Sequence, residues 1–242
     1  MKKLLLTFLT ALIIINLNSP VYSMSEVPPE AGYEFDEVSK WREEGELFLA
    51  LEGYERIIIK YPNTVYAAQS SAQRIIIFEA LLNANYNKVL KKRMAVWESK
   101  RRSEKKETER LEGEISSLNE QAAPLFWKFD EEVRRFDDAY KGKIDEITVH
   151  KIHIKEEQEK DYSMVNRQIK RRKLIPAKFY WNIASAYMIA VKTPLLKKEE
   201  ESIALYKAKT FCEEMMKITE EALSIKAAEK LMEEIERELK EQ

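Results

Sequence analysis

Glycine, proline and cysteine are scarce in this chain, and each shortage excludes a class of structure. The 242 residues include only five Gly and seven Pro, too few for the many turns of a sheet-rich protein. The single cysteine, Cys212, excludes an intramolecular disulfide, so packed apolar surfaces must hold the fold. We interpret this thiol as a small buried side chain on a helix; the alternative is a redox or intermolecular link. Glu, Lys, Ala, Leu and Ile are abundant instead, which predicts an all-α protein.

Motifs that carry chemistry are equally scarce. The sequence contains no Gly-rich phosphate loop, nucleophile elbow, His-Glu-x-x-His zinc motif or Cys pair. The only histidines are His150 and His153, and two imidazoles without nearby Cys or an assigned carboxylate are more typical of a solvated surface than of a metal site. We therefore predict a protein that is not an enzyme, with no catalytic residues, metal or cofactor. Carboxylate-only catalysis leaves no motif and stays an alternative.

The first residues have the pattern of an export signal. Lys2 and Lys3 precede an apolar run over residues 4–17, and Val21 and Ser23 put small residues at the two positions that a signal peptidase reads, with cleavage after Ser23. A run of this length is shorter than the roughly 20 residues that cross a bilayer. We predict that residues 1–23 are a signal peptide and that the mature protein is periplasmic or secreted. An uncleaved membrane anchor is the alternative.

Charge nearly cancels over the whole chain. The chain has 41 Lys and Arg and 42 Asp and Glu. This balance gives no preference for nucleic acid. Basic clusters occur at residues 91–93, 100–102, 105–106 and 170–173, with acidic residues between most of them. The ordinary interpretation is a solvated helix face with ion pairs one turn apart. A peripheral contact with an anionic membrane surface is the functional alternative.

Residues 34–60 predict two short antiparallel helices that follow a flexible segment, residues 24–33. The first helix covers residues 34–44, and Gly45 lets the chain leave it without a Cβ clash. The second covers residues 47–60, where an apolar stripe recurs every three or four residues. On that stripe, the small Ala50 allows close helix approach and Tyr54 fills the wider space one turn on. Pro62 ends the second helix.

A long helical hairpin is predicted for the middle of the chain. From Leu90 to Leu125 the spacing alternates four and three residues, as in a coiled-coil seam that begins with Leu90, Met94 and Trp97. Polar residues interrupt the seam at positions 101, 104 and 108. Because proline is tolerated at a helix start but not inside one, Pro124 favours two helices joined near residues 121–124, about 50 Å long. The β-branched segment 147–155 is predicted as helix.

The paired helices resemble the tetratricopeptide repeat, a helix-turn-helix unit of about 34 residues. The residues at the family's spacing are Trp41, Gly45, Ala50, Leu51, Tyr54, Pro62 and Asn63. Residues 57–73 are similar to exported family members of bacterial envelopes, including outer-membrane assembly and Tol-Pal-associated proteins. The next unit departs from the pattern, because Glu79 stands at the turn glycine and no closing proline follows. A second match recurs near the C-terminus, after Pro176, at Ala177, Tyr180, Ile183, Ala184 and Tyr187.

This resemblance implies a concave surface that holds a peptide segment and is lined by the first helix of each pair. By resemblance, the residues that face this groove are Tyr66, Gln69 and Gln73 in one unit and Lys178, Trp181, Ser185 and Met188 in the other. Trp181 is expected to contribute most, since aromatic side chains give a large contact area at low entropy cost. The alternative is that Trp181 packs against the hairpin.

The expected architecture is all-α, with tetratricopeptide-like pairs at both ends of a long hairpin. The predicted divisions are residues 34–86 for the N-terminal helices, 87–173 for the hairpin, and 174–242 for the C-terminal helices and a capping helix. The expected function is a non-enzymatic adaptor of the cell envelope that binds a protein or peptide partner. The alternative is a structural coiled-coil protein that self-assembles, and a homo-oligomer is compatible with either.

Overall fold

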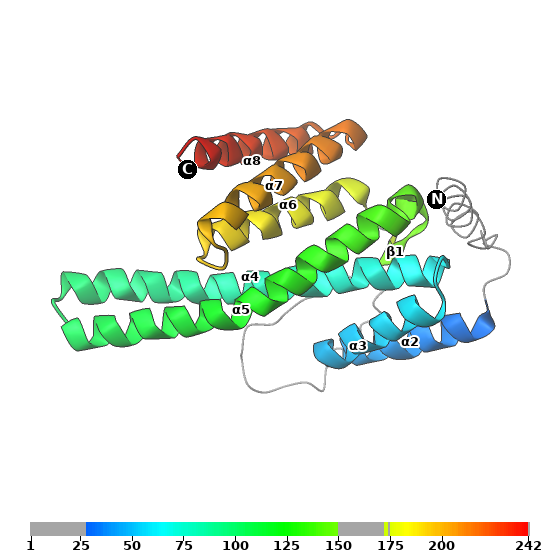
Figure 1. Ribbon diagram of the computed structural model, residues 1–242, viewed down its shortest axis with the longest axis horizontal. Coiled ribbons are helices and arrows are strands. Elements are labelled where there is room, and N and C mark those ends of the chain that lie inside the picture. The colour runs from blue at the N-terminus through cyan, green and yellow to red at the C-terminus, as the bar shows by residue number, and fades with distance from the viewer. Residues whose placement is uncertain (1–27, 150–171, 174, 242) are drawn as a thin grey trace, which may run out of the picture.

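The computed structural model describes residues 28–149, 172, 173 and 175–241, and nearly all of them are helical. The predicted all-α class is confirmed. In chain order the elements are α2 (Pro29–Glu43), α3 (Leu47–Lys60), α4 (Val65–Arg101), α5 (Lys105–Tyr140), the 3-10 helix η2 (Lys141–Glu146), β1 (Thr148–Val149), β2 (Arg172–Lys173), α6 (Pro176–Lys192), α7 (Lys198–Ile218) and α8 (Ala222–Glu241). Figure 1 shows α4 and α5 as a long pair with α2 and α3 on one side and α6 to α8 on the other.

α3 forms where the sequence predicts it, but α2 begins at Pro29, five residues before its predicted start at residue 34. Residues 29–33 of the predicted flexible segment are helical because Ala31 is fully buried in the core and Pro29 suits a helix start. Gly45 has φ +87°, the left-handed conformation that favours glycine, and the chain reverses there. Ala50 is fully buried in the helix contact, as predicted. A second small residue lies at the close approach: a Cβ added to Gly53 would stand 2.5 Å from Cγ2 of Val38. The helices therefore nest on Ala50 and Gly53, one turn apart.

α4 is a single helix of 37 residues. The Thr64 side chain caps its N-terminus by accepting a hydrogen bond of 3.2 Å from the backbone N–H of Ala67. At the position where the repeat has its turn glycine, this chain has Glu79, and no proline follows it. The helix therefore continues there instead of folding back. It also runs without a break across residues 86 and 87, where the sequence analysis placed a division.

The long hairpin exists, but the predicted connection at residues 121–124 is wrong. The chain reverses between Arg101 and Lys105, where Ser103 has φ +60°. The polar interruption of the seam therefore marked the turn. α5 continues through Pro124, with Ala122 and Phe126 buried on either side of it. This packing outweighs the lost backbone hydrogen bond, which costs about 3 kcal/mol. α5 changes direction near its middle (Figure 1), as expected of a helix that contains proline.

On α4 the seam lies at a different register from the predicted one. Leu90, Met94 and Trp97 are 37%, 68% and 62% exposed, whereas Val89 and Val96 are buried between the helices. A shift of one residue turns a helix face by about 100°, because a turn takes 3.6 residues. On α5 the predicted seam positions that are buried include Thr108, Leu111 and Ala122.

Beyond α5 the prediction of a helix over residues 147–155 fails at its start. Ile147 is fully buried, and Thr148 and Val149 pair antiparallel with Lys173 and Arg172 in a two-residue ladder. β-branched side chains suit an extended backbone better than a helix. The rest of this segment, with His150 and His153, lies outside the described residues.

α6 and α7 form an antiparallel pair, and α8 packs mainly on α7. Pro176 stands at the first position of α6, where its missing N–H costs no helix bond. Ala184 is fully buried, as predicted. Cys212 is buried on α7, and burial raises the pKa of its thiol to about 12. This matches the interpretation of Cys212 as a small packed side chain.

Candidate functional site

A cleft opens between α3 and α5 and has α4 as its floor. Its volume is about 410 Å³, within the range of about 300–1,000 Å³ that is usual for ligand sites. Both α3 and α5 pack on α4, so the walls come from segments that are far apart in the sequence. We call this hollow the α3–α5 cleft.

Apolar side chains line the base and one rim of the α3–α5 cleft. Leu51 and Phe78 are 6% and 2% exposed at its base, and Leu125 on α5 is partly buried. Phe48 stands at the rim with 63% of its surface exposed. Covering a phenylalanine side chain is worth about 1.5–3 kcal/mol. An exposed ring beside an apolar base is therefore a candidate anchor point for a partner.

Charged side chains form the opposite part of the cleft and are paired across three helices. Glu132, only 1% exposed, accepts hydrogen bonds from Ser71 Oγ at 2.7 Å and from Arg74 Nε at 2.6 Å. Glu55 on α3 joins Arg74 at 3.0 Å and Arg135 at 2.6 Å. Arg74 also donates to the carbonyl oxygen of Leu51 at 2.5 Å, replacing part of its lost hydration. This cluster connects α3, α4 and α5 around the cleft.

The same cluster keeps the carboxylate of Glu55 ionised. Burial alone raises the pKa of Glu55, but the hydrogen bond from Arg135 and the charge of Arg74 outweigh burial, so the pKa is lowered. Fixed ion pairs hold the wall in one geometry, and a partner then pays little ordering cost. The arrangement suits binding, with an apolar contact at one side and a polar rim at the other.

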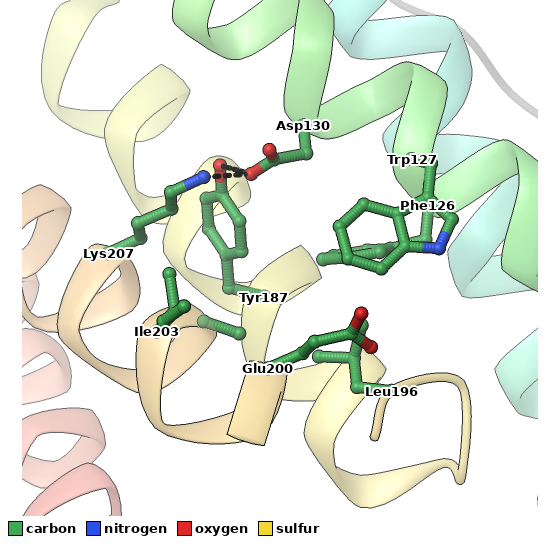
Figure 2. A pocket seen from close by; sticks show the side chains of 9 residues that line it. Phe126, Trp127, Asp130, Tyr187, Leu196, Glu200, Ile203 and Lys207 are labelled. Atoms are coloured by element: carbon green, nitrogen blue, oxygen red, sulfur yellow. Dashed lines mark hydrogen bonds and ion pairs between the residues drawn. The ribbon is translucent and has the colours of Figure 1, made fainter. Parts of the chain in front are cut away.

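A smaller pocket of about 60 Å³ lies between α5 and the α6–α7 pair. In Figure 2, Tyr187 and Lys207 both point at Asp130; the Tyr187 hydroxyl donates to Asp130 Oδ1 at 2.7 Å, and Lys207 pairs with the same oxygen. Burial, with the Asp130 charge, raises the pKa of Tyr187. Trp127 and Ile203 border the opening, 44% and 58% exposed. The volume corresponds to about two water molecules, so this pocket suits a structural role better than a ligand.

Glu79 is a partly buried carboxyl on α4 that lies near Lys178 of α6. Burial raises its pKa to about 7, while a hydrogen bond from Asn83 and the positive charge of Lys178 act in the opposite direction. Its charge therefore changes near neutral pH. It lies outside the α3–α5 cleft, and its expected effect is on stability.

The structure does not bring the seven predicted groove residues to one open surface. Gln69, Gln73 and Met188 are buried, and Gln73 accepts a hydrogen bond of 3.1 Å from Arg42 inside the contact with α2. Tyr66 is half-buried, with its ring centroid 5.6 Å from that of Phe35. The other three lie on α6: Lys178 is exposed, whereas Trp181 and Ser185 are half-buried. Trp181 packs against the hydrophobic core and is not a fully exposed side chain.

The residues that form the α3–α5 cleft were not predicted from the sequence as a binding site. Phe48 gave a usable signal, because it is a large apolar residue outside the apolar stripe of its own helix. Arg74 and Glu132 gave none, since 58 residues separate them and each sits among other charged residues. Only the packing of α5 on α4 brings these two together.

Over residues 28–149, 172, 173 and 175–241, no group of three or more His, Cys, Asp and Glu is placed to hold a metal ion. Within the same ranges, no helix combines the length and the apolar character needed to span a bilayer. Comparisons of the chain with protein-family profiles, with curated proteins and with solved structures found no match in any of the three.

Proposed function

We propose that this protein is a non-enzymatic scaffold of the cell envelope that holds a segment of a partner protein in the α3–α5 cleft. The observation that carries the proposal is the exposed ring of Phe48 at the rim of a cleft with an apolar base and a paired, charged wall. Interfaces gain most of their energy from a few apolar anchors that are surrounded by polar contacts. An amphipathic helix or an extended segment with one large apolar side chain fits this chemistry.

The tetratricopeptide-like character of the helix pairs is part of the proposal. It is supported by the left-handed Gly45 between α2 and α3 and by the burial of the small Ala50 and Ala184. The continuous α4 departs from the repeat, so in this proposal the partner segment lies between α3 and α5 instead of in a groove lined by the first helix of each pair. The predicted signal peptide, residues 1–23, supports the proposed location in the envelope.

Site-specific crosslinking in intact cells tests the proposed function. A photoreactive amino acid at Lys128, an exposed residue that lines the cleft, is expected to give a discrete adduct with one partner. Phe48→Ala should abolish this adduct because it removes the anchor. The matched control is Tyr206→Ala, which removes an aromatic ring of similar exposure, 62%, from α7, and it should leave the adduct unchanged.

Two results would contradict the proposal. One is an adduct that survives Phe48→Ala, and the other is an equal loss with Tyr206→Ala. Both rings are exposed, so neither change is expected to unfold the protein. Circular dichroism of each variant checks this point before crosslinking.

A further inference from the structure

The distal part of α4 carries a strong positive charge. Residues 88–102 include seven Lys and Arg and one acidic residue, Glu98. Across the hairpin, residues 105–120 of α5 include three Lys and Arg and five Glu. The α4 side and the α5 side of this arm therefore have opposite net charge.

The basic side of the arm also exposes large apolar side chains. Leu90, Met94 and Trp97 are spaced four and three residues apart, which places them on one face of the helix. Met94 and Trp97 are more than three-fifths exposed, at 68% and 62%. Arg101 continues the same face, with its guanidinium carbon 5.5 Å from the centroid of the Trp97 ring. Arg93, also exposed, flanks it, and its Nη2 donates a hydrogen bond of 3.3 Å to the backbone carbonyl oxygen of Lys192 at the end of α6. We call these five residues the arm face.

The arm face touches α6 through the hydrogen bond of Arg93 and otherwise projects past the neighbouring helices. Figure 1 shows the distal ends of α4 and α5 extending beyond both α2–α3 and α6–α8. One helix pair presents a convex surface, whereas a helical peptide of another protein is normally held in a groove. A convex surface instead fits an extended, nearly planar partner.

The chemistry of the arm face matches a lipid interface. Helices that lie in the plane of a membrane surface combine Lys and Arg with Trp, Phe or Leu on the face that enters the lipid. Tryptophan prefers the headgroup level, and each basic residue near an anionic surface contributes attraction. An acidic protein would satisfy the charge, but it would leave Met94 and Trp97 without an apolar environment.

We propose that the arm face docks on the surface of an anionic phospholipid membrane. Met94 and Trp97 enter the boundary between headgroups and acyl chains, while Arg93 and Arg101 contact lipid phosphates. The acidic α5 side is repelled by the same surface and turns away from it, so the arm binds in one orientation. This inference uses a surface separate from the α3–α5 cleft and does not rest on the proposed function.

Vesicle binding tests the inference directly. The protein is used as isolated from the expressing cells, and every variant is compared with the wild type in that same form. The wild type should bind vesicles of phosphatidylglycerol and phosphatidylcholine more tightly than vesicles of phosphatidylcholine alone. Brominated lipid should quench the fluorescence of Trp97, measured as the difference from Trp97→Phe. High salt should weaken the anionic preference, because the Debye length falls to about 3 Å at 1 M.

Paired variants separate charge from apolar contact. Arg93→Gln with Arg101→Gln should weaken binding to the anionic vesicles about 30-fold. Its matched control is Lys226→Gln with Lys230→Gln, which removes two exposed charges from α8 and should not reduce binding. Met94→Ala with Trp97→Ala should weaken binding at least about tenfold. Because all four arm positions are exposed, the thermal unfolding temperature should stay near that of the wild type.

Several outcomes overturn the inference. These are equal binding to both vesicle types, equal losses in the α8 control, or no quenching of Trp97 by brominated lipid. An acidic protein that binds the arm face while the vesicles do not would also overturn it, as would concentration-dependent self-association that the Met94 and Trp97 changes abolish. Phe48→Ala should leave vesicle binding unchanged, so failure of the cleft proposal and failure of this one give different results.

Discussion

The two halves of the α4–α5 pair are built from the same helices but have different surroundings. In the proximal half of α4, all residues from 67 to 73 are buried, so the helix is covered on every side. In the distal half, from residue 84 to residue 101, only Val89, Val96 and Ser99 are buried. The proximal half therefore belongs to the core, and the distal half is free to present its side chains to a partner.

Ion pairs differ between the halves in the same way. Glu132 in the proximal half is 1% exposed and is held by Arg74. Glu114 in the distal half pairs with Lys92 and Arg110, and its side chain is 36% exposed. An exposed pair contributes little to stability, whereas a buried charge that loses its partner is costly. Stability should therefore concentrate at one end of the hairpin.

The largest expected effect is the loss of a proximal aromatic ring. Phe129 is fully buried, and its ring centroid lies 5.5 Å from that of Tyr187. Phe129→Ala should lower the free energy of unfolding by about 3–5 kcal/mol. The distal counterpart, Val96→Ala, should cost about 1.5 kcal/mol. Urea unfolding measures both changes, and equal losses would show that the distal seam contributes as much as the core.

Breaking the proximal ion pair should give the next largest effect. Glu132→Gln leaves the buried guanidinium of Arg74 with only Glu55 as a carboxylate partner, and it should cost about 3 kcal/mol of unfolding free energy. The matched distal change, Glu114→Gln, should leave the unfolding temperature nearly unchanged. Thermal unfolding of the two variants compares the sites. A larger loss with Glu114→Gln would reverse the comparison.

The smallest expected effect appears in the pH dependence of stability. The pKa of Glu79 is about 7 in the folded protein against 4.5 in the unfolded chain, so the folded state holds the proton more tightly. Its favourable contribution is complete below pH 4.5 and is lost as the pH rises to about 7. Glu79→Gln should therefore raise the unfolding free energy at pH 8 by on the order of 2 kcal/mol and change it little at acidic pH.

A distal carboxylate provides the control for this pH effect. The hydrogen bond from Arg110 lowers the pKa of Glu107, so its contribution is present above pH 4.5 and is lost only at lower pH. Glu107→Gln should therefore leave the stability profile between neutral and alkaline pH unchanged. Thermal unfolding across this range checks both variants. A Glu79→Gln profile parallel to that of the wild type would contradict the assignment.

Local patterns predicted the short helices well. Gly45 and Pro62 bound α3, and its apolar stripe placed Ala50 and Tyr54 in the core. Pro176 similarly marked the start of α6. These signals act within a few residues, so the chain carries them without reference to the rest of the fold.

Features that depend on packing between distant segments gave a wrong prediction or no prediction. Pro124 suggested a helix start, yet the burial of Phe126 and Phe129 holds α5 together across it. The alternating four- and three-residue spacing predicts a distal seam at Leu90, Met94 and Trp97. The partner helix instead covers Val89 and Val96 and leaves the larger side chains outside.

The amino-acid sequence by itself determined the helical class, both ends of α3, the start of α6 and the antiparallel pairing of neighbouring short helices. These follow from composition, from 3.6-residue periodicity and from the few Gly and Pro residues that punctuate it. Only the tertiary structure decided which face of α4 meets α5, and which charges meet at Glu132. Those contacts join segments about 60 residues apart, and many registers satisfy the same local pattern until the whole core is packed.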